Sequence, residues 1–309
     1  MRKEAQEHGP HLRQLQACLV AAVLSCSFAC NMPEGSRNVE VHGHRGCRGL
    51  LPENTVPAFL KATELGCHWL ELDVVLNAEG QVVVSHEPWM DHRICLDPNG
   101  QRIDSLRERD HNIQLMTQAE VMRYDCGSLP HPDFPQQVNS RQHKPLLREV
   151  VDSVRRFAAE RGLRVPRFNV EVKSEPELYH THQPTPDRYT GAVLGELRAL
   201  GIDKDCLVQS FDPAVLNAVH ALAPEVATAL LVDNADGAEA NLARIAYRPA
   251  VYSPAKELVT PELLALLRAR GIGIAVWTVN DTADMRRFIG MGVDGIITDY
   301  PDRLLGLLR

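Results

Sequence analysis

The chain of 309 residues has little of what marks several large classes of protein. It has no excess of basic residues, because 33 Lys and Arg stand against 40 Asp and Glu, and this excludes a general polyanion-binding protein. It shows no internal repeat or low-complexity tract, and with 44% apolar and 24% charged residues it is neither collagen-like, a coiled coil nor disordered. Any phosphate chemistry must therefore use a local group of basic side chains.

The N-terminal segment has no apolar run long enough to cross a bilayer as a helix, which takes roughly 20 residues. Its uncharged run, residues 17–29, follows Arg2, Lys3 and Arg13 and is typical of a signal-peptide core. Small residues precede both Cys26 and Cys30, so either is a candidate for lipidation. We expect residues 1–38 to be a signal peptide or lipoprotein leader with its linker. The protein would then be exported, periplasmic or at the cell surface, with a lipid anchor in the second case.

The eight cysteines form no Cys-x-x-Cys motif and no cluster with metal-ligand spacing. Five of them lie beyond the leader, so at least one is unpaired. In an exported protein, Cys95 and Cys126, which flank a polar insertion, are candidates for one disulfide. We interpret Cys67 and Cys206 as small core residues.

From residue 39 onward, short apolar strands alternate with amphipathic helices, which is the pattern of a parallel α/β fold. The eight expected strands are residues 39–44, 69–75, 168–172, 206–210, 226–231, 250–253, 272–278 and 295–298. The helices between them carry start and stop signals, as in 56–65 ended by Gly66, 146–161 ended by Gly162, and 262–270 with Thr260 as N-cap. Eight such units predict a closed (β/α)8 TIM barrel over residues 39–309.

Two segments interrupt the alternation. The apolar run 82–86 follows the second strand after a connection too short for a parallel crossover, so it should fold back as a β-hairpin. If Leu76 and Gln81 close the turn, Val84 lies opposite Asp73 and His86 opposite Glu71. The polar, proline-containing stretch 91–144 is interpreted as an insertion over the barrel mouth.

Acidic side chains gather on two neighbouring strands near their predicted C-terminal ends, where barrel enzymes place their sites. Glu71 and Asp73 share one face of the second strand, and Glu171 and Lys173 share one face of the third, because side chains alternate with a period of two. Buried charges are costly unless they are paired or bound to a metal. The three carboxylates suit a divalent cation with oxygen ligands, and a structural salt-bridge cluster is the alternative.

Five motifs follow one another along the chain: HGHRGCRGLLPENTVPAF, ELDVVLNAEGQVVVSHE, NVEVK, VWTVN and DGIITDYP. The first ends the first strand with His44-Arg45-Gly46 and opens the first helix with Asn54 as a candidate N-cap. An isolated HRG would be a weak signal, but the order and spacing of the set are specific. From Val39 to the C-terminus the chain resembles the glycerophosphodiester phosphodiesterase family.

The resemblance implies a TIM barrel that hydrolyses glycerophosphodiesters to sn-glycerol 3-phosphate and an alcohol. It implies that Glu71, Asp73 and Glu171 are ligands of Ca²⁺ or Mg²⁺. It also implies that His44 and His86 are the acid–base pair and that Arg45 and Lys173 contact the phosphate. Trp277 would be an aromatic residue of the glycerol pocket. Phe211, after the fourth strand, is a further candidate for the pocket wall. The residue after His86 is Glu87, where the family more usually has Asp.

The chemistry of a phosphodiester agrees with these roles. Its hydrolysis needs charge neutralisation, an activated nucleophile and a proton for the leaving oxygen. A metal, Arg45 and Lys173 supply the first, and two histidines can divide the other two tasks. We favour His44 as base and His86 as acid. The sequence leaves open the head group, the metal, and whether water or the adjacent glycerol hydroxyl attacks first.

Other interpretations remain open at the level of sequence. A phospholipase D-like hydrolase or lyase acting on lysophospholipids would use the same acids and histidines, with an apolar rim on the mouth loops. A non-catalytic surface binding lipoprotein would tolerate loss of either histidine, and both are present. Individually, His86 could be an ordinary hairpin residue, Arg45 a partner of Glu53, and Trp277 and Phe211 core packing.

Overall fold

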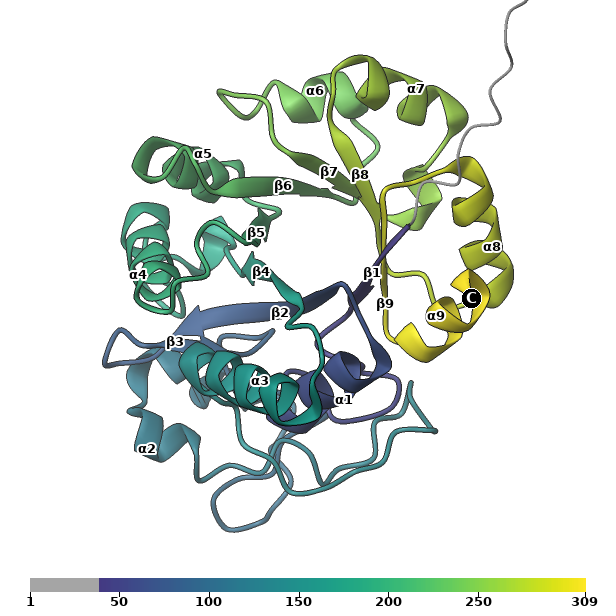
Figure 1. Cartoon of the computed structure of the whole chain (residues 1–309). Helices are drawn as coiled ribbons and strands as arrows, with labels where there is room; N and C mark the ends of the chain where they lie inside the picture. The colour runs from purple at the N-terminus through teal and green to yellow at the C-terminus, as the bar shows by residue number, and fades with distance from the viewer. Residues whose placement is uncertain (1–38) are drawn as a thin grey trace, which may run out of the picture. The chain divides into compact units, whose positions relative to one another are not determined.

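The computed structural model describes residues 39–309, and its centre is a closed barrel of eight parallel strands (Figure 1). The expected leader, with Cys26 and Cys30, lies outside the described residues. The barrel strands are β1 (Glu40–Gly43), β2 (Trp69–Leu76), β4 (Arg167–Val172), β5 (Cys206–Ser210), β6 (Ala227–Val232), β7 (Val251–Pro254), β8 (Gly273–Val276) and β9 (Gly295–Thr298). Each pairs in parallel with its neighbours, and β1 closes the ring by pairing with both β9 and β2. The predicted TIM barrel is confirmed, with strand ends within two residues of those expected.

Helices surround the barrel and begin and end largely where their capping residues indicate (Figure 1). They are α1 (Val56–Leu65), α2 (Gln118–Val121), α3 (Leu147–Arg161), α4 (Pro186–Ala199), α5 (Pro213–Leu222), α6 (Ala238–Leu242), α7 (Pro261–Ala269), α8 (Thr282–Met291) and α9 (Pro301–Leu308). The expected N-cap at Asn54 is wrong, because Thr55 caps α1 by accepting from the Ala58 N–H. Asn54 instead adopts a left-handed conformation, φ 56°, and its amide donates to Asp73.

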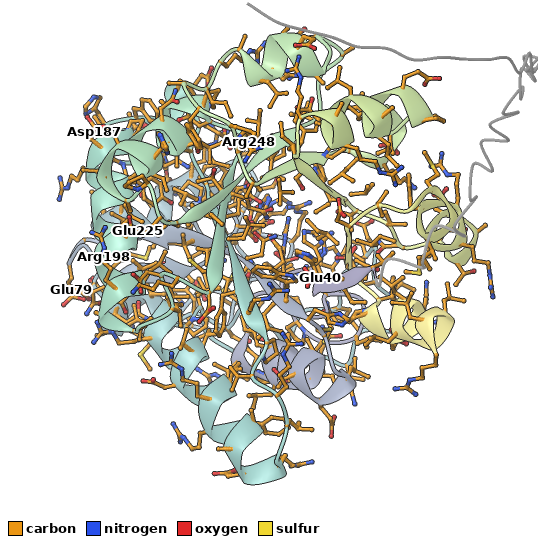
Figure 2. All side chains as sticks on the ribbon, turned by 45° about the horizontal axis from the view of Figure 1, so that its top comes forward. Glu40, Glu79, Asp187, Arg198, Glu225 and Arg248 are labelled. Carbon is orange, nitrogen blue, oxygen red and sulfur yellow. A yellow bond between two sulfur atoms is a disulfide. The ribbon has the colours of Figure 1, made fainter. Side chains whose placement is uncertain are left out.

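The barrel strands separate two kinds of side chain. Along β2, Leu70, Leu72 and Val74 are fully buried in the apolar layer shared with the helices, while Glu71 and Asp73 point to the other face. Charged side chains on the helix layer lie at the periphery, as with the Arg198 and Glu225 pair (Figure 2). The apolar layer thus fixes the direction of the acids.

The hairpin after β2 forms, but its register differs from the prediction by one residue. β3 (Val82–Val84) pairs antiparallel with β2, with Val84 opposite Val74 and not Asp73. The Asn77 side-chain oxygen accepts two N–H groups of the turn, and Gly80, at φ 72°, takes the left-handed position. These contacts pair Asn77, not Leu76, with Gln81. His86 therefore reaches the acids through the turn after β3 and not opposite Glu71.

The insertion, residues 91–144, packs beside β2 and β3 at one side of the barrel mouth (Figure 1). It has an apolar cluster of its own, and the predicted disulfide between Cys95 and Cys126 lies within that cluster. Cys67 and Cys206 are buried free thiols, as expected, and so is Cys47. Among residues 39–309, no helix has the length and apolar character that crossing a membrane requires.

Candidate active site

The loop after β1 carries the HRG motif into the barrel mouth. The His44 N–H donates to the Thr298 carbonyl at the end of β9, which fixes the loop to the neighbouring strand. Arg45 has φ 48°, a left-handed conformation that costs a non-glycine residue about 1 kcal/mol or more. Gly46 follows at φ 86°, and a Cβ there would lie 2.8 Å from the backbone of Ala58. The backbone is thus folded tightly so that two successive side chains enter the mouth.

Three carboxylates meet at the ends of β2 and β4. One oxygen each of Glu71, Asp73 and Glu171 lie within 4.8 Å of one another, and all three residues are buried. The Arg45 N–H and the Gln209 amide hold Glu71, at 2.8 and 3.0 Å. The predicted convergence of these acids is therefore present.

The charges around these acids shift their proton affinities in opposite directions. Burial raises the pKa of Glu71 well above its usual range, and the carboxylates of Asp73 and Glu171 add to the rise. Burial also acts to raise the pKa of Asp73, but the Arg45 guanidinium, Lys173 and the hydrogen bond from Asn54 act together against it and the pKa is lowered. The group has more negative charge than its cations balance, and this favours either a proton on Glu71 or a bound cation.

His86 and Lys173 form one side of the site. The Lys173 Nζ lies 3.1 Å from His86 Nε2 and donates to Glu171 Oε1 at 2.7 Å. Burial acts to lower the pKa of Lys173, but the carboxylates of Glu171 and Asp73 together outweigh burial and the pKa is raised, so the amine stays protonated. Because an ammonium can only donate, Nε2 accepts and Nδ1 carries the hydrogen, which faces Glu87 Oε1 at 2.7 Å. Glu87 thus serves as the partner of the imidazole.

His44 forms the opposite side. Its Nδ1 lies 2.6 Å from Asp299 Oδ1, and its Nε2 lies 3.9 Å from Glu71. Asp299 also accepts from Arg48 and, at 2.6 Å, from the amide of Asn280. Burial lowers the pKa of His44 while Asp299 acts to raise it, and the net shift is downward, which favours a neutral ring. The Nε2 lone pair of His44 is then free on the side of the acids.

A cavity of about 240 Å³ lies between the two histidines. The predicted residues that line it are His44, Arg45, Glu71, His86, Glu171, Lys173, Phe211 and Trp277, joined by Arg48, Gln209, Leu231, Thr278 and Ile297. Phe211 and Trp277 form one wall with their rings edge to face, 5.3 Å between centroids. Asp73 lies behind this surface, within the acid group. All residues expected at the site are therefore brought together.

Four residues of the site were missed or misassigned from the sequence. Arg48 forms an ion pair with Asp299, at the adjacent ends of β1 and β9. The Gln209 amide donates to Glu71, and the Asn54 amide donates to Asp73 at 2.8 Å. Each lies in or beside a run with a sequence signal, since Arg48 and Asn54 stand in the first motif and Asp299 in the last. The sequence did not show which of these runs contact one another in the folded protein.

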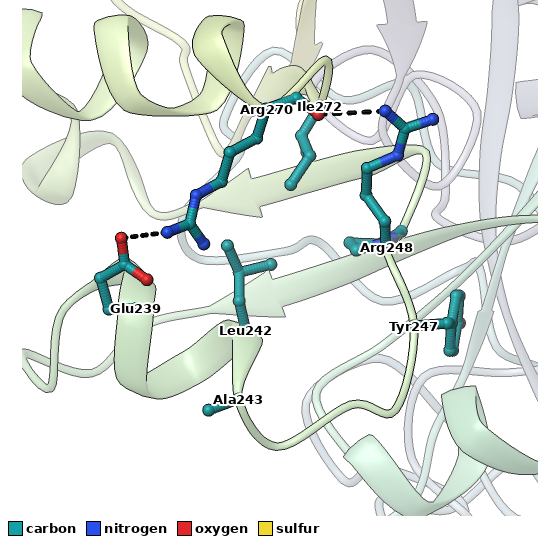
Figure 3. A pocket seen from close by; sticks show the side chains of 8 residues that line it. Glu239, Leu242, Ala243, Tyr247, Arg248, Arg270 and Ile272 are labelled. Atoms are coloured by element: carbon teal, nitrogen blue, oxygen red, sulfur yellow. Dashed lines mark hydrogen bonds and ion pairs between the residues drawn. The ribbon is translucent and has the colours of Figure 1, made fainter.

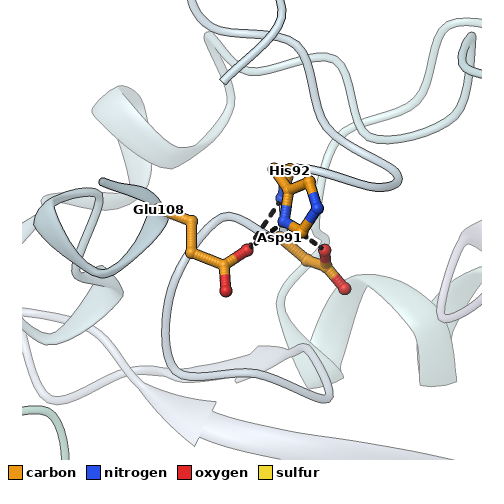
Figure 4. A group of neighbouring side chains, drawn as sticks. All are labelled: Asp91, His92 and Glu108. Carbon is orange, nitrogen blue, oxygen red and sulfur yellow. Dashed lines mark hydrogen bonds and ion pairs between the residues drawn. The ribbon is translucent and has the colours of Figure 1, made fainter. Parts of the chain in front are cut away.

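Two other features outside this cavity carry chemistry-bearing side chains. In the insertion, His92 bridges Glu108 and Asp91 (Figure 4), but Arg93 already forks onto both oxygens of Asp91. A second cavity, of about 440 Å³, lies near the N-terminal ends of β7 and β8. There Arg270 pairs with Glu239, and Arg248 donates to the Arg270 carbonyl (Figure 3).

Comparison with known proteins shows to which family the chain belongs. The sequence model of the glycerophosphoryl diester phosphodiesterase family matches residues 44–303, the span that holds the two histidines, the acids and Lys173. The chain belongs to this family. A Caldanaerobacter subterraneus protein named glycerophosphodiester phosphodiesterase is 29% identical over 274 residues, which are 87% of this chain and 97% of that protein.

Solved structures of the family share the fold. The crystal structure of a glycerophosphoryl diester phosphodiesterase homologue from Silicibacter pomeroyi is 31% identical, with a TM-score of 0.76 over 89% of this chain and 96% of that one. A phosphodiesterase from Oleispira antarctica, solved with the product sn-glycerol 3-phosphate, is 22% identical, with a TM-score of 0.68 over 86% and 95% of the two chains. The second likeness supports the barrel alone.

Proposed function

We propose that this chain hydrolyses glycerophosphodiesters to sn-glycerol 3-phosphate and an alcohol. The main support for the proposal is the cavity of about 240 Å³, which is lined by His44 and His86, by buried carboxylates and by cationic side chains. Its volume suits a phosphate with a small polyol, and its cations suit an anion. Family membership supports the same reaction, as does the name of the Caldanaerobacter relative.

A divalent cation, Ca²⁺ or Mg²⁺, fits the acid group. Glu71, Asp73 and Glu171 would hold it, since these hard cations prefer carboxylate oxygens. The Asp73 Oδ1 atom is buried and, among residues 39–309, has no hydrogen-bond partner, which is costly unless a ligand takes it. When bound, the cation neutralises charge on the phosphate.

The protein's own groups perform the proton transfers in this proposal. His44, held at Nδ1 by Asp299, has Nε2 free to take the proton of the attacking oxygen of water or of the adjacent glycerol hydroxyl. In its charged form, with Nε2 protonated and Lys173 turned from Nε2 to the phosphate, His86 protonates the leaving oxygen, and Glu87 on its Nδ1 stabilises the charged ring. Arg45 and Lys173 neutralise the phosphate.

The two aromatic rings complete the proposed substrate site. Trp277 is fixed because its Nε1 donates to the Ser253 carbonyl at 2.7 Å, and its ring contacts that of Phe211. Both line the cavity, so they would pack against the carbons of the glycerol.

A coupled assay for released sn-glycerol 3-phosphate tests the proposal. The purified protein is given glycerophosphodiesters of choline, ethanolamine, glycerol and inositol, with Ca²⁺, with Mg²⁺ and with excess EDTA. We expect release with metal and none with EDTA, and a fall of about 10² or more in kcat for His44→Ala and for His86→Ala. His143→Ala, in the insertion and away from the cavity, is the matched control. Full turnover in EDTA contradicts the metal role, and a near-wild-type rate removes that histidine from the mechanism.

The same assay also tests the alternative of a phospholipase D-like hydrolase or lyase that acts on lysophospholipids. The exposed apolar residues Leu106 and Leu115 stand on the insertion and do not line the cavity. Of the residues that line it, Phe211 is the one exposed large apolar side chain, so an acyl chain would gain little contact beside the reacting phosphate. We therefore expect no release of choline from lysophosphatidylcholine. Release of choline without sn-glycerol 3-phosphate would favour the alternative.

We further propose that the protein is exported, with or without a lipid anchor. The Cys95–Cys126 disulfide supports this, because disulfides persist in oxidising compartments. Fractionation of cells that express the full chain tests it. Recovery in the cytoplasm with both cysteines reduced would refute it.

A further inference from the structure

A second guanidinium faces the cavity beside His44. Arg48 stands three residues after Arg45 on the loop that follows β1, and it lines the cavity. Its Nε and Nη2 atoms donate to the two oxygens of Asp299, at 2.9 and 3.3 Å, and its Nη1 lies 3.5 Å from Glu53. Two buried carboxylates therefore set the plane and position of the guanidinium.

The insertion covers the outer face of this guanidinium. The ring of Phe134 lies 4.6 Å from Arg48 Cζ and is buried itself, against the rings of His131 and Tyr300. The Gln137 amide donates to the Arg48 carbonyl at 2.7 Å. Arg48 is thus held from both ends of its side chain, so little conformational entropy would be lost when it binds a ligand.

Within residues 39–309, the contacts of Arg48 do not use all of its N–H donors. A guanidinium has five N–H groups, and the contacts with Asp299 and Glu53 engage three. The side chain is 18% exposed, Phe134 covers one of its faces, and it lines the cavity. Arg45 is less exposed, at 10%, with its Nη1 donating to Glu53 at 2.7 Å and its Nε 3.3 Å from Asp73. Free cationic N–H groups therefore border the cavity on the His44 side.

We propose that Arg48 is a substrate-binding residue that donates to an oxygen of the phosphate group, and that Phe134 of the insertion holds it in place. The inference rests on the proposed function, because it takes the phosphate of the diester as the ligand. It adds to Lys173, on the His86 side, a second cation on the opposite side of the cavity. The phosphate would then contact Lys173 near His86 and Arg48 near His44.

Equilibrium binding tests this inference without requiring turnover. Inorganic phosphate and sn-glycerol 3-phosphate are titrated into the folded wild type and variants, at a fixed Mg²⁺ concentration and again without metal. We expect Arg48→Met to lower the affinity for both ligands by about 10-fold or more. Arg48→Lys should lower it less, because Lys keeps the positive charge but cannot form the two-pronged hydrogen bonds of a guanidinium. Phe134→Leu, which leaves the guanidinium but removes its support, should weaken them several-fold.

Arg148→Met is the matched control, because Arg148 also forks onto a carboxylate, that of Glu196, but stands on α3 and does not line the cavity. Its affinity for both ligands should stay within about twofold of wild type. Wild-type affinity in Arg48→Met, or an equal loss in Arg148→Met, overturns the inference. If Arg48→Met does not fold, Arg48→Lys and Phe134→Leu carry the same decision. A wild type that binds phosphate through Arg48 but hydrolyses no diester would refute the proposed function and leave the anion contact standing.

Discussion

The Nδ1 atom of His44 lies 2.6 Å from the Oδ1 atom of Asp299, 255 residues further along the chain. The two residues follow β1 and β9, which are neighbours because the barrel closes there. Burial acts to raise the pKa of Asp299, but the contacts with His44 and Arg48 outweigh it and the pKa is lowered, so the carboxylate stays ionised. An ionised carboxylate accepts the Nδ1 hydrogen and leaves Nε2 of His44 without one.

Asp299→Asn should therefore reduce turnover through the tautomer of His44. The new amide can donate to Nδ1, which moves the ring hydrogen to Nε2 and blocks proton acceptance there. We expect kcat to fall by about 10² or more. Steady-state kinetics measure this, and the ¹⁵N shifts of the His44 ring report the tautomer.

Asp212→Asn is the control for that variant. Asp212 is similarly buried at the end of β5, where it accepts from Ser174 at 2.6 Å and contacts no histidine of the site. It should retain kcat within about threefold. An Asp299→Asn enzyme as fast as Asp212→Asn would show that the contact with His44 has no catalytic role.

A metal at the acid group should stabilise the fold in a way that depends on Asp73. A ligand that binds only the native state raises Tm, and millimolar Ca²⁺ or Mg²⁺ should do so for the wild type. Asp73→Asn removes one carboxylate and should abolish most of the rise. Asp91→Asn, in the other group of acids, is the matched control and should keep it, since Arg93 already pairs with Asp91. An equal rise in Tm for all three proteins would place the cation elsewhere.

The buried His42 should make stability depend on pH. Burial, with the charge of Arg167 adding to it, lowers the pKa of His42 to about 3, so the folded state keeps the ring neutral while the unfolded chain protonates it near pH 6.5. The unfolded state then binds the extra proton as pH falls from 6.5 towards 3, and stability declines over that range. Between pH 7 and pH 5 this contribution is about 2 kcal/mol.

Urea unfolding of wild type and His42→Gln at pH 7 and pH 5 measures the effect. Gln keeps a polar side chain of similar size but does not titrate in this range. The stability of the wild type should fall more steeply than that of His42→Gln, by about 2 kcal/mol. Equal falls in both proteins would show that His42 does not contribute.

Loss of the Cys95–Cys126 disulfide should lower stability by about 3 kcal/mol, because the bridge closes a loop in the unfolded chain with a sequence separation of 31 residues. Calorimetry of Cys95→Ala/Cys126→Ala measures the loss. Dithiothreitol should reproduce it in the wild type and leave the double variant unchanged. An equal response of both proteins to the reductant would assign the effect to another cause.

The candidate site was predictable where its signal is local to one strand. Glu71 and Asp73 alternate with Leu70 and Leu72, and this period of two already indicates that both acids share a face. The hairpin register was not predictable in the same way, because it depends on which residues the side chain of Asn77 engages in the turn. A one-residue difference there exchanges the two faces of a strand.

The sequence by itself determined the alternation of strands and helices, the direction of the acids and the order of the motifs, because these follow from periodicity and from residue types close in the chain. Only the tertiary structure decided that Asp299 holds His44, that Arg48 enters the cavity, and that Phe134 of the insertion supports it. These contacts join segments far apart in the sequence. Closure of the barrel and packing of the insertion create them, and no local pattern encodes which distant segments will meet.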